Sequence, residues 1–129
     1  MTKTFLIGGI SFAGLAVIFG AFGAHALKER ISQEQLLVFE TGVRYQFYHS
    51  LALIILFLLG EKLSPSLLQY SGVFFIIGII LFSGSLYLLS TREMSGIENW
   101  KSVLGPVTPL GGLCFIIGWT TLLFAALKS

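Results

Sequence analysis

Three uncharged, apolar stretches constrain the fold of this chain more than any other feature. They cover residues 4–24, 67–91 and 107–127, and none of them contains a charged residue. The hydrocarbon core of a bilayer is about 30 Å thick, and about 20 apolar residues of α-helix are needed to cross it. The three stretches therefore predict three transmembrane helices.

The composition agrees with a membrane protein of one domain. Of the 129 residues, 55% are hydrophobic and only 11% are charged, whereas soluble domains carry about 25% charged residues. The net charge of +2 comes from scattered residues, which argues against nucleic acid as a partner because binding it needs clustered Lys and Arg. Cys114 is the only cysteine, so the chain cannot form an internal disulfide.

The N-terminus has some features of a secretory signal. Lys3 precedes the first apolar stretch, and the small-residue motif "AHA" follows it at residues 24–26. The uncharged part, residues 4–24, is longer than the signal core of about 7–15 residues. We therefore expect a retained transmembrane helix.

A fourth span is predicted from a shorter apolar run. Residues 50–60 would cover only about 16 Å at 1.5 Å per residue, so about 20 residues counted back from Gly60 place the start of the helix at Thr41. The prediction is an all-α, integral membrane four-helix bundle, a single domain over residues 1–129 with both termini on one side. Its spans are residues 4–24, 41–60, 67–91 and 107–127.

Residues 32–47 have the pattern of an amphipathic helix leading into the second span. Ser32 and Gln35 fit a capping box, and Glu40 and Arg44 have the spacing of a helical ion pair. An interfacial helix is the simplest interpretation. The apolar positions form one narrow stripe with spacings of three and four: Leu36, Phe39, Val43 and Phe47.

The distribution of positive charge favours one orientation. The loops after the first and third spans hold Lys28, Arg30, Arg44, Arg92 and Lys101, and the other side holds Lys3, Lys62 and Lys128. The positive-inside rule places the first group in the cytoplasm and the termini outside. The spans are also rich in glycine, which predicts close contacts between helices.

Polar groups deep in a membrane bundle are the first functional candidates. His49 is expected near the bilayer midplane, on a polar helix face with Thr41, Tyr45 and Tyr48. That face is expected to turn inward, because lipid exposure of polar groups is costly. The alternatives are a neutral, structural histidine and a proton or ligand site. The partners expected on the third span are Ser83, Ser85 and Tyr87.

A second candidate site lies at one membrane face. It is either an ordinary interfacial rim, with Arg44 and Arg92 extending to headgroups, or a site for an anionic lipid headgroup or small anion. Its members are His25, Glu40, Arg44, Arg92 and Lys101.

The sequence contains no recognisable catalytic or cofactor motif. His25, His49, Cys114 and Glu40 lack the spacing of metal ligands, and no G-x-S-x-G or acidic pair is present, so we expect no metal, no haem and no enzyme activity. A proton-coupled exporter would need a membrane-embedded carboxylate, and none of the four spans contains one. Trp119 is expected to be a core aromatic whose indole hydrogen needs a partner.

Four motifs resemble the YgdD-like family of small membrane proteins, family of unknown function 423. They are "GAFGAH" at 20–25, "FETGVRYQFYH" at 39–49, "LFSGSLY" at 81–87 and "LGPVTPLGGLCFIIGW" at 104–119. The resemblance implies a four-helix protein of the bacterial cytoplasmic membrane, and it supplies no activity or site residue.

The leading functional hypothesis is a non-enzymatic membrane module that binds a lipid or a protein partner. Membrane lipids are the expected partners, with a homo-oligomer or another membrane protein as alternatives. The second hypothesis is an oligomeric channel or small-solute transporter that uses His49, Ser83 and Ser85 as its polar path.

Overall fold

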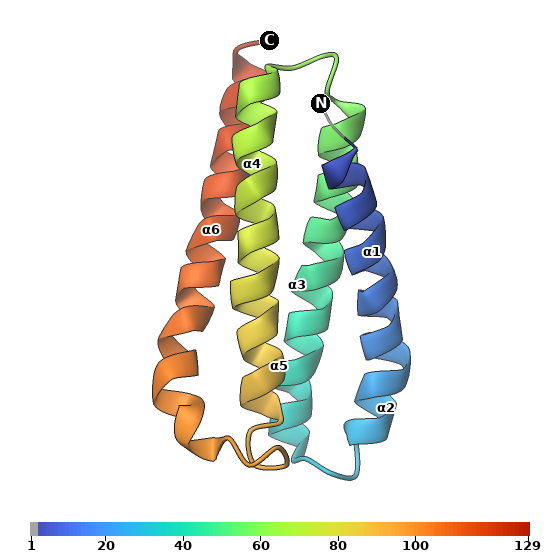
Figure 1. The fold of residues 1–129 in the computed structure, drawn as a ribbon, viewed down its shortest axis with the longest axis vertical. Coiled ribbons are helices and arrows are strands. Elements are labelled where there is room, and N and C mark those ends of the chain that lie inside the picture. The colour runs from blue at the N-terminus through green and yellow to red at the C-terminus, as the bar shows by residue number, and fades with distance from the viewer. Residues whose placement is uncertain (1–2) are drawn as a thin grey trace.

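The computed structural model describes residues 3–129, which form helices and loops and contain no strand. Four long helical segments lie side by side, with the start of α1 and the end of α6 at the same end of the molecule (Figure 1). Two of the segments contain a π-helical turn, η1 and η2. The elements are α1 Thr4–Ile18, η1 Phe19–Gly23, α2 Ala24–Leu27, α3 Gln33–Leu58, α4 Pro65–Gly78, η2 Ile79–Ser83, α5 Gly84–Ser90, η3 Glu98–Trp100 and α6 Lys101–Leu127.

Three of the four segments are long and apolar enough to cross a membrane: Thr4–Leu27, Pro65–Ser90 and Glu98–Leu127. These correspond to the three apolar stretches of the sequence, and the all-α class is confirmed. The fourth segment, α3, is long, but its polar residues, among them Arg44 and Gln46, lower its hydropathy. A membrane crossing by α3 therefore remains a prediction.

Helix α3 begins where its capping residues predict. The Ser32 hydroxyl accepts a hydrogen bond from the Gln35 amide at 3.1 Å, and the Gln35 side chain accepts one from the Ser32 amide at 3.4 Å. The helix then continues without a break to Leu58. The predicted amphipathic helix, residues 32–47, and the predicted second span, residues 41–60, are therefore parts of one helix.

Two expectations about this helix need correction. Within residues 3–129, Arg44 donates to the Thr41 hydroxyl at 3.1 Å and forms no ion pair with Glu40. The apolar stripe packs against the first helical segment: a Cβ built on Gly20 would lie 3.2 Å from Val43, and one on Gly23 would lie 3.2 Å from Phe39. The stripe is therefore a helix–helix contact, which differs from the interfacial helix that we expected.

Several glycines allow the helices to approach closely, as the sequence suggests. A Cβ on Gly9 would lie 2.7 Å from the Ser50 carbonyl oxygen of α3, and one on Gly111 would lie 2.3 Å from the Phe82 backbone nitrogen. Small residues permit such backbone approach, which stabilises helix pairs by packing. Gly8, Gly14 and Gly84 differ, because nothing lies within 4 Å of a Cβ built there.

The apolar core lies toward the end of the molecule where α1 starts and α3 ends. Phe5, Leu56 and Leu68 are fully or almost fully buried there. The buried polar side chains instead extend over much of the length of the helices, and these residues form the candidate site: Gln46, His49, Ser50, Ser71, Ser83, Ser85 and Ser90.

Candidate functional site

The inward face of α3 includes His49, as we predicted, but its other members differ from the predicted set. Gly42, Gln46 and His49 are buried, whereas Tyr45 is 38% exposed and Tyr48 is 52% exposed. Thr41, also expected to face inward, is half-buried. Small Gly42 lets the Tyr87 ring approach α3, since a Cβ at this position would lie 2.9 Å from that ring.

Gln46 joins three helical segments and was missed by the sequence reasoning. Its side-chain nitrogen donates to the Phe12 carbonyl oxygen of α1 at 2.8 Å, and its side-chain oxygen accepts from the Tyr87 hydroxyl of α5 at 2.6 Å. Gln46 is only 3% exposed. Its position within the predicted span was a usable signal, because any polar side chain at depth is a functional candidate.

His49 is 4% exposed and both of its ring nitrogens are engaged. Nδ1 lies 2.7 Å from the Tyr45 carbonyl oxygen, and Nε2 lies 3.0 Å from the Trp119 indole nitrogen of α6. The ring stacks on Phe115, with centroids 3.6 Å apart and an angle of 8° between the planes. Trp119 is 46% exposed and is therefore not the core aromatic that we expected. Its indole hydrogen does have a partner, as expected, and that partner is His49.

The polar residues predicted on the third span are all partnered inside the protein. Ser83 donates to the Gly42 carbonyl oxygen at 2.7 Å, and the Ser85 hydroxyl lies 2.6 Å from that of Thr108. Tyr87 donates to Gln46. These bonds connect the third span to α3 and α6. Among the described residues, none of these three hydroxyls bonds to His49.

The five residues predicted at one membrane face do not form a contact cluster. They come from α2, α3, the loop after α5 and the start of α6. Of these, α2, that loop and the start of α6 lie at the end of the molecule opposite the start of α1 (Figure 1). Within residues 3–129 no hydrogen bond or ion pair links them to one another. His25, Arg44 and Lys101 are exposed, and Glu40 and Arg92 are half-buried.

Arg92 is the most enclosed cation of this set. One terminal guanidinium nitrogen donates to the Leu89 carbonyl oxygen at 2.7 Å. Its Nε atom is buried and has no hydrogen-bond partner. Arg92 is therefore fixed at the end of α5, whereas Arg44 lies on an open surface.

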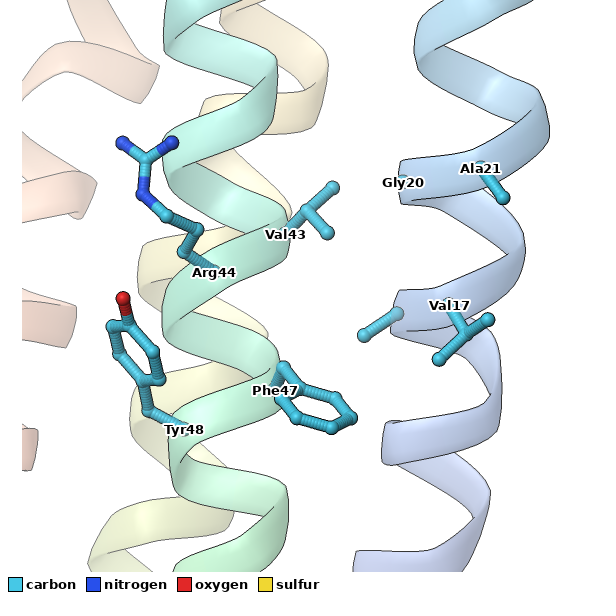
Figure 2. Close-up of a pocket in the computed structure, with 8 residues that line it drawn as sticks. Val17, Gly20, Ala21, Val43, Arg44, Phe47 and Tyr48 are labelled. Carbon is cyan, nitrogen blue, oxygen red and sulfur yellow. The ribbon is translucent and has the colours of Figure 1, made fainter.

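A groove lies beside Arg44, between the first helical segment and α3. It has a volume of about 370 Å³ and is lined by Ala16, Val17, Gly20, Ala21, Val43, Arg44, Phe47 and Tyr48. Figure 2 shows Val43 and Phe47 directed toward the first segment, and Arg44 and Tyr48 on the other flank of α3. Small residues and the π-helical turn at Phe19–Gly23 form the wall opposite α3. Arg44 is the only charged residue of the lining.

A second cavity, of about 560 Å³, lies between α3 and α6 beside His49. Tyr45, Phe115 and Trp119 contribute aromatic walls to it. Neither cavity has the residues of a metal centre: within residues 3–129, no three His, Cys, Asp or Glu side chains are grouped to hold an ion.

The sequence comparisons identify relatives over the full length of the chain. The profile of a family described as "Protein of unknown function (DUF423)" matches residues 19–112. The chain is 45% identical over 127 residues to the UPF0382 membrane protein YwdK of Bacillus subtilis (strain 168), and 98% of both chains is covered. No solved structure matches the chain.

Two further relatives extend the comparison. A UPF0382 membrane protein of Staphylococcus aureus (strain bovine RF122 / ET3-1) is 43% identical over 126 residues, which cover 98% of this chain and 97% of the relative. The UPF0382 inner membrane protein YgdD of Escherichia coli (strain K12) is 34% identical over 129 residues, which cover 99% and 93%.

Proposed function

We propose a function for this chain, which belongs to the DUF423 family, from its membrane-facing geometry: it is a non-enzymatic module that binds an anionic lipid at Arg44. The chain is a multi-pass membrane protein, because three of its helices are long and apolar enough to span and its relatives are named membrane proteins. The single observation that carries the proposal is an exposed guanidinium beside an apolar groove, which bonds to the Thr41 hydroxyl but pairs with no carboxylate among residues 3–129.

The proposal treats α3 as the fourth span of a four-helix bundle. Its 26 residues extend about 39 Å at 1.5 Å per residue, which exceeds the hydrocarbon thickness of about 30 Å. It packs on α1, α4 and α5. Four crossings also agree with the start of α1 and the end of α6 lying at one end of the molecule.

In this arrangement Arg44 lies well inside the helix. It is about 17 Å along the axis from Gln33 and about 21 Å from Leu58, at 1.5 Å per residue. Its guanidinium turns toward the N-terminal end of α3 (Figure 2). One of its nitrogens donates to the Thr41 hydroxyl. A snorkelling side chain of this kind brings its charge close to the headgroups.

The charge of Arg44 lacks a counter-ion in the protein. An arginine at the centre of a membrane helix costs about 2.5–3.5 kcal/mol on insertion scales, and no carboxylate within residues 3–129 pairs with Arg44. A lipid phosphate provides the complementary charge and can accept two parallel hydrogen bonds from the guanidinium. The adjacent groove then accommodates an acyl chain of the same lipid.

Lipid retention tests this proposal. Protein in detergent is mixed with phosphatidylglycerol or phosphatidylcholine, and the bound lipid is counted by native mass spectrometry. We expect selective retention of phosphatidylglycerol, with at least about a tenfold loss of affinity in Arg44→Gln, equivalent to about 1.4 kcal/mol. Lys101→Gln is the control, because Lys101 is an exposed cation that does not line the groove.

The groove is tested separately from the charge. Ala21→Leu fills its wall, and Ala26→Leu makes the same change at an exposed position outside the lining. The first variant should lose lipid and the second should retain it. Equal retention of both lipids by the parent chain, or full retention in Arg44→Gln, would contradict lipid binding at this surface.

The transport hypothesis receives less support from the geometry. A polar path through His49, Ser83 and Ser85 needs groups that are free to bind a solute. The two serine hydroxyls bond within the protein, and both His49 nitrogens are engaged. We therefore propose no transport activity.

A further inference from the structure

The hydrogen bonds of His49 define its tautomer. The Tyr45 carbonyl oxygen can only accept, so Nδ1 must carry the hydrogen of the 2.7 Å contact. The Trp119 indole nitrogen can only donate, so Nε2 must present its lone pair at 3.0 Å. His49 is therefore a neutral imidazole with the hydrogen on Nδ1.

This tautomer makes the link between α3 and α6 sensitive to a proton. A proton added to His49 occupies the Nε2 lone pair, and Nε2 then presents a hydrogen to the indole hydrogen of Trp119. Two donors cannot share a hydrogen bond. The bond between these two residues, 70 positions apart in the chain, is therefore lost when the imidazole is charged.

The surroundings of His49 can accommodate the charged ring. Phe115 stacks on it at 3.6 Å, and Phe75 and Trp119 have centroids at 5.4 and 5.8 Å. Aromatic faces within about 6 Å attract a cation. The α6 groups that face His49 are Phe115 and Trp119, and the α4 group is Phe75. Tyr45 on α3 is the only titratable side chain in contact among the described residues, and no charged side chain contacts the ring.

The cavity between α3 and α6 provides access to this position. His49 and Trp119 both line it, together with Tyr45. Trp119 is 46% exposed, so its side chain has space to move when its acceptor is lost. The two residues of the Trp119–His49 hydrogen bond thus form part of the cavity wall.

We propose that Nε2 of His49 is a proton-binding site within the membrane, and that its occupancy releases Trp119 and opens the cavity between α3 and α6. The proton adds to the lone pair from water, no other bond to the ring changes, and the Trp119–His49 hydrogen bond breaks. This site is separate from the lipid groove, whose lining includes neither residue.

The test follows the indole hydrogen directly. Trp100→Phe leaves Trp119 as the only tryptophan, and the protein with isotope-labelled tryptophan is titrated in nanodiscs by NMR from about pH 8 to about pH 4, a range that spans ordinary imidazole protonation. We expect the Trp119 N–H resonance to shift toward that of an unbonded indole on acidification. A resonance that stays fixed over this range would overturn the proposal.

Two variants assign the transition. In His49→Gln the amide oxygen can still accept from Trp119 but has no proton to gain, so the shift with pH should disappear. His25→Gln removes the other histidine and should leave the shift unchanged. An undiminished shift in His49→Gln would assign the transition elsewhere and also overturn the proposal.

A second measurement keeps His49 intact. In His25→Gln the nitrogen resonances of labelled histidine report only His49. We expect the Nδ1-protonated tautomer at about pH 8 and a doubly protonated ring after acidification. An Nε2-protonated ring at about pH 8 would contradict the proposal, and this readout does not depend on lipid binding.

Discussion

Individual polar side chains determine how the interior of this protein is held together. Gln46 uses both ends of its amide, one toward α1 and one toward α5. In a membrane interior an unpaired amide finds no water, so each lost partner has a cost. The amide therefore fixes the rotation of α3 about its own axis, and with it the outward position of Arg44.

We expect Gln46→Leu to destabilise the protein by about 1–2 kcal/mol, the range measured for interhelical hydrogen bonds in model membrane helices. The substitution removes the acceptor of the half-buried Tyr87 hydroxyl. Unfolding in mixed micelles measures the loss, and Gln69→Leu at an exposed position of α4 is the control. Adding Tyr87→Phe should recover part of the loss; an additive double variant would show that the two groups do not interact.

Helix spacing is controlled by a few glycines and by the two π-helical turns. Gly111 brings the α6 backbone against that of Phe82 in η2. The other π-helical turn, η1, contains Gly20 and borders the groove. π-helical turns often occur at functional positions, and here each lies opposite the same part of α3.

Gly111→Ala should destabilise the pairing of α6 with η2. The added Cβ would lie 2.3 Å from the Phe82 backbone nitrogen, which cannot move without the helix. Overpacking of this kind costs about 1–3 kcal/mol, measurable as a lower unfolding midpoint in detergent. Gly112→Ala is a matched control, because its Cβ would have only an ordinary contact at 3.8 Å. Equal midpoints for the two variants would refute the close approach.

Capping motifs, hydropathy and segment length predicted where the helices lie in the sequence better than they predicted which face of a helix turns inward. The start of α3 follows from Ser32 and Gln35, and three apolar helices follow from hydropathy and length. The inward face of α3 was predicted correctly at His49 but incorrectly at Tyr45 and Tyr48, because the apolar stripe and the aromatic residues were taken as guides. Gly42 and Gln46 determine that face through partners on α1, η2 and α5, and these partners cannot be identified from the spacing of residues along α3.

The arrangement of the complete chain places its loops at two opposite ends. The loop after α3 lies at the end where α1 starts, and the loops before α3 and after α5 lie at the other end (Figure 1). The Lys and Arg residues of the second end outnumber those of the first. The positive-inside rule therefore favours a cytoplasmic location for the loops around Lys28 and Arg92.

Site-directed labelling checks this orientation. Cys114→Ser removes the only cysteine, and Glu61→Cys or Glu93→Cys then places one in each type of loop. In intact bacterial cells an impermeant maleimide should label the first variant, and it should label the second only after the cells are opened. The reverse pattern would invert the topology, and labelling of both in intact cells would contradict a membrane crossing by the segment Pro65–Ser90 between the two loops.

The double use of the Gln46 amide also has a consequence for how the protein is made. During synthesis the Phe12 carbonyl precedes Gln46, whereas Tyr87 follows it by 41 residues. In the proposed four-span arrangement, the side-chain nitrogen finds its partner when α3 enters the membrane, but the side-chain oxygen has no partner until the next helix arrives. We therefore expect insertion of the first two helices to yield an incomplete intermediate, whose assembly is completed by the arrival of Tyr87.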